Sequence, residues 1–171
     1  AAMALYRDAL SVAESGDGAA AMERLTDLVK TYPDFAPAYN NLGVLYCQSG
    51  DNANALSHYE TAVRIEPDNT TYLKNLADFY YVVQKDAEKA LGLYTKCISL
   101  DPNDIEPLCM VGRISIEHGQ LANAQYFYSR ILEIDPDNED AAGTLRVLND
   151  RVRPATSGEY ASDPGETTAR S

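Results

Sequence analysis

The residues best suited to chemistry in this sequence are two histidines, three cysteines and a run of carboxylates. His58 and His118 are far apart, and neither has a Cys or His at metal-ligand spacing. Cys47, Cys97 and Cys109 are odd in number and widely spaced, unlike a disulfide framework, so we expect reduced thiols. No glycine-rich phosphate loop follows a strand pattern. These observations predict no metal, no cofactor and no catalytic site.

The acidic turn at 135–140 places carboxylates at alternate positions, which faintly resembles a calcium loop. It lacks the central glycine and a distal glutamate at the required spacing, and Pro136 interrupts it. Helix capping and a favourable interaction with the helix dipole explain these acids better. The chain is therefore predicted not to be an enzyme.

The charge balance limits the partners of this chain. Asp and Glu number 26 and Lys and Arg number 14, which gives a net charge of −12. Such a surface repels phosphate backbones and anionic membranes, so we expect no nucleic-acid partner. No apolar run approaches the roughly 18 residues of a membrane span, so direct membrane insertion is not expected. The compartment stays open: cytoplasmic is slightly favoured, and removal of an upstream signal would be compatible with a periplasmic or extracellular location.

A repeat of 34 or 35 residues dominates the sequence. Pro33, Pro67, Pro102 and Pro136 each sit in a similar acidic turn, and apolar positions keep the same offsets from every proline. The offsets have the period of amphipathic helices, with two helices between successive prolines. The sequence therefore predicts an all-α array of helix pairs.

The second unit carries the clearest motif, with an aromatic, a Leu-Gly pair and a Tyr on its first helix, followed by Ala, an aromatic and Ala on its second: Tyr39, Leu42, Gly43, Tyr46, Ala55, Tyr59 and Ala62. This pattern resembles the tetratricopeptide repeat. The resemblance covers about residues 2–152 and implies an α-solenoid of four helix-turn-helix units, at about 2–35, 36–69, 70–104 and 105–138. The third unit has one extra residue, which we place in its inner turn near Gln84 to Asp86.

Local signals agree with this register. Asp17, Asp51 and Asp86 precede the second helices as expected N-caps. Gly43 and Gly112 predict a close approach of the paired helices, with tyrosines filling the space between them. A helix expected at 139–152, with an apolar stripe of Ala142, Leu145, Leu148 and Val152, would cap the last unit. Residues 153–171 are rich in Pro, Ser, Gly and Thr and predict a flexible tail.

The resemblance also implies where a ligand would bind. In that family the first helices line a concave groove, which makes this chain a scaffold for a peptide or partner protein. The groove candidates are Asn40, Asn41, Val44, Gln48, Lys74, Asn75, Asp78, Tyr81, Arg113 and Glu117.

Two ways of holding a peptide can be compared with these positions. Asn41 and Asn75 share one repeat position, where an amide could pair with a peptide backbone or serve packing alone. A clamp for the carboxylate of a chaperone tail needs converging cations. In the resembled family this clamp uses five positions of the first helices, which are Asn40, Val44, Asn75, Glu106 and Met110 in this chain. Only Asn75 has the residue type that the clamp requires, and Glu106 would repel the ligand.

A structural role is the alternative. A repeat array has two complementary ends, and contact of one end with the other would build head-to-tail oligomers or filaments. The first unit is the least regular and could seat the last helix of a neighbouring copy. The sequence therefore leaves open a homo-oligomer beside a foreign peptide or protein ligand.

Overall fold

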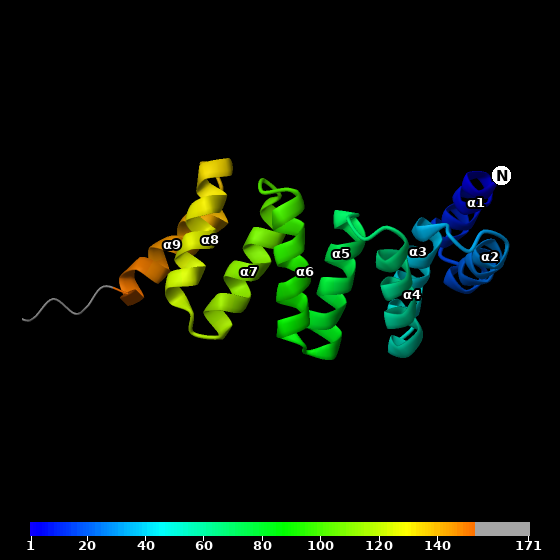
Figure 1. The fold of residues 1–171 in the computed structure, drawn as a ribbon, viewed down its shortest axis with the longest axis horizontal. Helices are drawn as coiled ribbons and strands as arrows, with labels where there is room; N and C mark the ends of the chain where they lie inside the picture. Colours follow the sequence, from blue (N-terminus) through cyan, green and yellow to red (C-terminus); the bar gives the residue numbers. More distant parts are fainter. Residues whose placement is uncertain (153–171) are drawn as a thin grey trace, which may run out of the picture.

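The computed structural model describes residues 1–152, and the predicted tail at 153–171 lies outside them. The described residues form nine α-helices, one π-helical segment and no strand. The helices follow one another along the long axis, with α1 and α9 at opposite ends (Figure 1). They are α1 (Ala2–Glu14), α2 (Gly18–Thr31), α3 (Ala36–Gln48), α4 (Asn52–Ile65), α5 (Thr70–Asp78), η1 (Phe79–Gln84), α6 (Ala87–Leu100), α7 (Ile105–Glu117), α8 (Leu121–Ile134) and α9 (Glu139–Val152).

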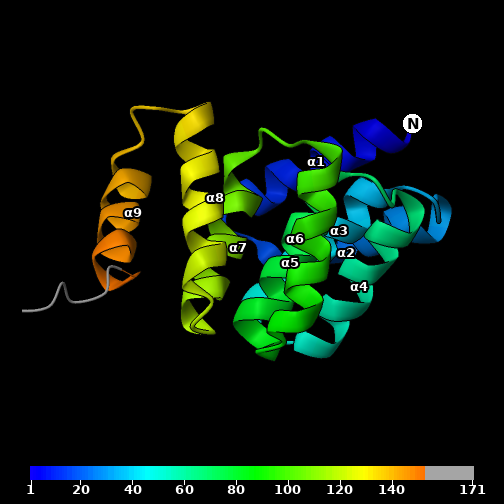
Figure 2. The same ribbon diagram turned by 60° about the vertical axis from the view of Figure 1, so that its left-hand side comes forward.

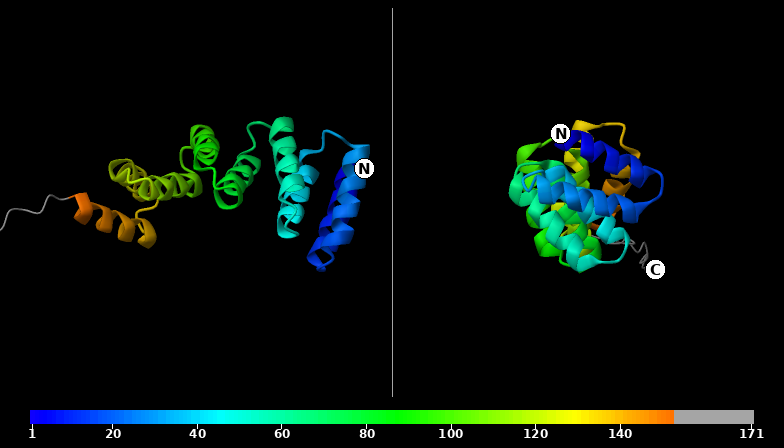
Figure 3. Two further views of the ribbon diagram at one scale, coloured as in Figure 1. Left: turned by 90° about the horizontal axis from the view of Figure 1, so that it is seen from below. Right: turned by 90° about the vertical axis from the view of Figure 1, so that its right-hand side faces the viewer.

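The helices stack in one dimension. Extensive contacts join only helices that follow one another in the chain, with η1 alone lying between α5 and α6, as in a solenoid. Figure 2 shows α9 beside α8 at the end of the stack, and Figure 3 shows that the helix directions change from the α1 end to the α9 end. The all-α solenoid predicted from the sequence is confirmed. We refer to α1, α3, α5, α7 and α9 as the first helices and to α2, α4, α6 and α8 as the second helices.

The turns inside the units confirm three predicted caps. The side chains of Asp17, Asp51 and Asp86 each accept a hydrogen bond from the backbone N–H three residues later, at 3.0–3.2 Å. Each cap satisfies an N–H group that the start of a helix leaves free. The second helices α2, α4 and α6 therefore begin directly after the expected capping residues.

The extra residue of the third unit lies earlier than predicted. In the first and second units, the capping aspartate donates its N–H to a carbonyl five residues before it, whereas Asp86 donates to Tyr80, six residues before it. The segment η1 takes up the additional residue, because a π-helical turn holds one more residue than an α-helical turn. The residue directly before the capping aspartate keeps a positive φ: Lys85 has φ 58°, and Gly50 at the same position of the second unit has φ 82°.

In each unit a large side chain from the second helix fills the space between the two helices. Leu25, Tyr59, Tyr94 and Tyr128 occupy equivalent positions, and all four are buried. A Cβ atom on Gly43 would lie 2.7 Å from Tyr59 Cδ1, and one on Gly112 would lie 2.9 Å from Tyr128 Cε2. The predicted close approach is thus confirmed, since no larger residue leaves room for these rings.

The last helix only partly matches its predicted stripe. Leu148 is buried and Leu145 is half-buried in a cluster with residues of α8, and Ala142 is half-buried. Val152 is exposed, contrary to the prediction, because it lies in the final turn of α9 beyond the residues that pack on α8. Val147, which lies outside the predicted stripe, is exposed as well.

Candidate functional site

The first helices form a wall that is hollowed between successive units. The α1/α3 pocket, of about 290 Å³, has Leu10, Ala13 and Val44 on its sides, Gln48 at its rim and Leu25 of α2 as its floor. Its lining is mostly apolar, with a few polar groups, as in ordinary ligand sites. Asn41, Val44 and Gln48, three of the predicted groove residues, therefore line one cavity.

The α3/α5 pocket, of about 250 Å³, is more polar. Asn75 and Asp78 line it from α5, and Cys47 lines it from α3. The rings of Tyr59 and Phe79 form its aromatic part, with centroids 5.7 Å apart. Two further predicted groove residues, Asn75 and Asp78, thus line one cavity, and the buried rings of Tyr59 and Phe79 form its floor.

A third cavity, the α7/α9 pocket of about 440 Å³, lies at the other end of the wall. Ile116 of α7 faces Gly143, Val147 and Arg151 of α9 across it. Sequence reasoning missed this pocket because it treated α9 only as a cap. The helix occupies the place of a fifth first helix and extends the wall by one unit.

Polar side chains bridge the junction between α5 and α7. The Tyr81 hydroxyl donates a hydrogen bond to Glu117 Oε1. Burial, with this hydrogen bond and the charge of Glu117, raises the pKa of Tyr81. Arg113 lies exposed on α7, with Nη1 3.7 Å from Met110 Sδ. Tyr81 of η1 and Glu117 of α7, two predicted groove residues, thus join two units, whereas the contact of Arg113 stays within α7.

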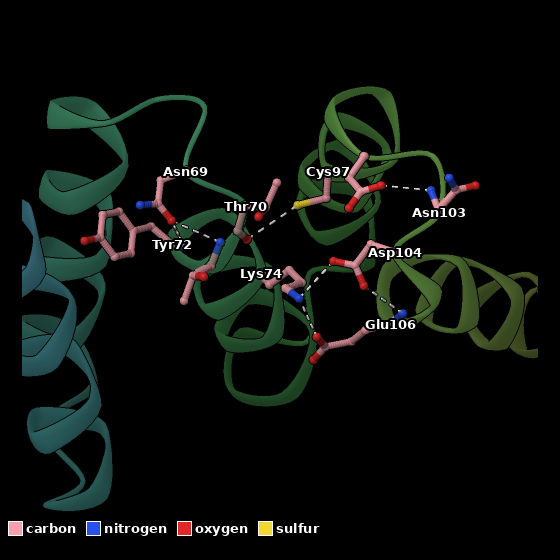
Figure 4. A network of polar contacts seen from close by, with 10 residues as sticks. Asn69, Thr70, Tyr72, Lys74, Cys97, Asn103, Asp104 and Glu106 are labelled. Carbon is pink, nitrogen blue, oxygen red and sulfur yellow. Dashed lines mark hydrogen bonds and ion pairs between the residues drawn. The ribbon is translucent and has the colours of Figure 1, made fainter. Parts of the chain in front are cut away.

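Lys74 binds two carboxylates of the next unit at the same junction (Figure 4). Its Nζ lies 3.0 Å from Asp104 Oδ2 and 2.6 Å from Glu106 Oε2. Burial lowers the pKa of Lys74, but the hydrogen bonds and charges of Glu106 and Asp104 outweigh it and raise the pKa overall. Because the Lys74 ammonium already binds two carboxylates, it is not available to an anionic ligand.

The predicted asparagines pair across units. Asn75 Nδ2 donates to Asn40 Oδ1 at 2.8 Å, and Asn41 Nδ2 donates to the Tyr6 hydroxyl at 2.8 Å. The acceptors Tyr6 and Asn40 share one repeat position, as do the donors Asn41 and Asn75. Asn40 is only 7% exposed, so this predicted wall residue lies within the junction. The amides hold successive units in register, and the oxygens of Asn41 and Asn75 are left as acceptors.

The partner of Asp78 was not evident from the sequence. The Tyr94 hydroxyl of α6 donates to Asp78 Oδ1. Burial raises the pKa of Asp78, although the hydrogen bond from Tyr94 acts in the opposite direction. A tyrosine rather than a phenylalanine at a fully buried position was the signal, because a buried hydroxyl requires a polar partner.

The side chains of His58 and Cys97 serve packing. His58 stacks on Tyr46, with centroids 5.2 Å apart, and lies 5.9 Å from Tyr39. Burial lowers the pKa of His58, although the charge of Asp51 opposes this. Burial also raises the pKa of Cys97 to about 11, and its Sγ lies 3.8 Å from the Thr70 carbonyl (Figure 4). The Cys97 thiol is thus protonated and inert at neutral pH.

Two features of the described part of the chain bear on other functions. Among residues 1–152, His, Cys, Asp and Glu form no group of three placed to hold a metal ion. Within the same residues, no helix has both the length and the apolar character needed to cross a membrane.

Known proteins show the same repeats. Two family models, each described as a tetratricopeptide repeat, match residues 36–69 and 93–126. The chain is 29% identical over 150 residues to the human protein O-mannosyl-transferase TMTC3. The matched segment covers 85% of this chain and 16% of that protein. The chain spans 16 to 38% of the length of the first curated relatives that it matches.

Solved structures share the fold. A tetratricopeptide repeat protein from Parabacteroides merdae matches with a TM-score of 0.79 and 24% identity, over 88% of this chain and 60% of that one. The first TPR of Spaghetti (RPAP3), bound to an HSP90 peptide, matches with a TM-score of 0.59 and 22% identity, over 68% of this chain and 91% of that one. The repeat matches, the stacked helix pairs and the Gly-Tyr contacts agree, and the chain belongs to the tetratricopeptide-repeat family.

Proposed function

We propose that this chain is a non-enzymatic scaffold that binds a peptide or a segment of a partner protein along the wall of its first helices. The observation that carries the proposal is the row of cavities between successive first helices, at α1/α3, α3/α5 and α7/α9. Tetratricopeptide repeats generally mediate protein–protein interaction, and the Spaghetti (RPAP3) structure holds a peptide. An extended segment can place different side chains in different cavities of such a wall.

The charges of the wall favour a neutral or basic segment. Lys74 is already bound by Asp104 and Glu106. Asp78 lines the α3/α5 pocket as a carboxylate, and the whole chain has a net charge of −12. Complementary charge governs which partners approach and which are rejected. An acidic peptide tail is therefore disfavoured as the ligand.

Replacement of Val44 by Arg should block the α1/α3 pocket and weaken peptide binding about tenfold. Val44 is half-buried at this pocket, and a long arginine can fill the cavity while its guanidinium reaches solvent. The loss of one buried apolar contact, worth about 1.4 kcal/mol, corresponds to tenfold in affinity. The measurement is retention of a randomised short-peptide pool on the immobilised chain, read by mass spectrometry.

Leu100→Arg is the matched control for this test. Leu100 is exposed at the end of α6 and lines none of the three pockets, so the variant adds the same charge elsewhere. It should retain peptides like the original chain, and circular dichroism should show equal helix content in all three proteins. Equal retention by Val44→Arg, or no retention by the original chain, would contradict the proposal.

Self-assembly is a second candidate, favoured by apolar side chains at both ends of the solenoid. Met3 and Leu5 are exposed on α1, and Val147 and Val152 are exposed on α9. Because α1 and α9 lie at opposite ends, contact between them would join copies head to tail (Figure 1). Light scattering should then show a mass that climbs with concentration without a plateau. A steady monomer mass of 18.7 kDa would remove this candidate.

A further inference from the structure

We infer that the α3/α5 pocket is an anchor for a basic side chain, Lys or Arg, of the bound segment. This inference rests on the proposed function, since it specifies what one cavity of the wall would take. Asn75, Asp78, Tyr59 and Phe79 are the residues that would carry it. The argument depends on an uncompensated carboxylate, a second acceptor beside it and an aromatic floor.

Asp78 is a carboxylate without a cationic partner in the part of the chain that the structure describes. Its only hydrogen bond there is the one that its Oδ1 accepts from Tyr94, which is neutral. The nearest lysine along α5, Lys74, lies one turn earlier and is directed to Asp104 and Glu106. Burial, with the charge of Glu106, raises the pKa of Asp78, and the hydrogen bond from Tyr94 and the charge of Lys74 lower it by less. A bound cation would supply a positive charge to pair with the Asp78 carboxylate.

Asn75 gives the pocket a second acceptor. Its Nδ2 donates to Asn40 Oδ1, and within residues 1–152 its own Oδ1 remains free to accept a hydrogen bond. Ammonium and guanidinium groups only donate hydrogen bonds, whereas carboxylates only accept them. A pocket with two acceptor groups therefore selects cations and rejects acidic side chains.

The remaining lining suits the stem of a long basic side chain. Tyr59 and Phe79 offer aromatic surface, on which an alkyl chain can pack and a cation can be attracted to a ring face. Val82 and Val83 complete the apolar side and belong to η1. Single π-helical turns occur frequently at functional sites, and this one forms part of the pocket.

The test compares peptide pools that differ at one position. Each pool holds short randomised peptides with a central residue fixed as Arg, Lys, Leu or Glu, and retention on the immobilised chain is read by mass spectrometry. The original chain should retain the Arg and Lys pools roughly tenfold more strongly than the Leu pool, as a charge-assisted hydrogen bond allows. Asp78→Asn should abolish this preference while its amide oxygen still accepts from Tyr94.

Glu23→Gln is the matched control, because it removes one negative charge from an exposed residue of α2 outside all three pockets. It should keep the preference for Arg and Lys. Retention of all pools alike, or a preference that survives in Asp78→Asn, would overturn the anchor and leave the peptide groove standing. Failure of every pool to bind the original chain would overturn the peptide groove together with the anchor.

Discussion

Gly43→Val should lower the free energy of unfolding by about 3 kcal/mol, because the second unit has no space for a side chain at this position. A Cβ there would lie 2.7 Å from Tyr59 Cδ1 and 2.8 Å from Cε1. The Tyr59 ring is buried and packs against Phe79, so it cannot move aside without disturbing the next unit. Urea unfolding followed by circular dichroism measures the loss, which should also lower the melting temperature by several degrees.

Gly92→Val provides the matched control inside another helix. A Cβ on Gly92 of α6 would meet no atom within 4 Å, so the substitution causes no clash. Valine has a helix propensity a few tenths of a kcal/mol better than glycine, and the control should be neutral or slightly more stable. A Gly43→Val variant that melts like this control would show that α3 and α4 do not pack in the register described above.

The sequence was sufficient to predict the parts of the fold that follow from local patterns. Prolines at a nearly constant step marked the units, and Asp17, Asp51 and Asp86 marked the starts of second helices. The contact between Gly43 and Tyr59 also follows from the repeat, because helix pairs can approach closely only where one residue is small. Each of these signals lies within one unit.

Contacts between units were harder to predict. The bond from Asn75 to Asn40 spans 35 residues, and it depends on how far α5 shifts along α3, which no local pattern specifies. Sequence reasoning therefore placed Asn40 on the open wall. The position of the extra residue was also missed, because η1 and a longer turn would use the same residues and differ only in backbone hydrogen bonds.

The bond between Asn41 and Tyr6 and the bond between Asn75 and Asn40 use equivalent positions, but the junction between the third and fourth units has no such bond. The equivalent donor in the fourth unit is Met110, which cannot donate a hydrogen bond, and the equivalent acceptor is Lys74, which cannot accept one. The ion pairs of Lys74 with Asp104 and Glu106 join the units there instead. This junction should therefore depend on charge, while the two earlier ones depend on neutral hydrogen bonds.

Lys74→Met should accordingly lower the free energy of unfolding by about 1–3 kcal/mol. Methionine keeps the apolar stem but leaves Asp104 and Glu106 close together without a cation. The Lys74 and Asp104 side chains are only 20% and 22% exposed, so water replaces the lost contacts incompletely. In a solenoid this is a loss at one interface, and we expect α7 to α9 to unfold at lower urea concentration than the preceding helices.

Lys30→Met tests whether partial burial and position between units, rather than charge itself, produce this effect. Lys30 pairs with Asp27 on the same helix, and their side chains are 69% and 67% exposed. An exposed pair of this kind contributes little to stability, and its loss should leave a single unfolding transition. Urea unfolding of both variants at equal ionic strength makes the comparison. Equal, small losses would mean that Lys74 forms a surface ion pair and that apolar packing alone joins the third and fourth units.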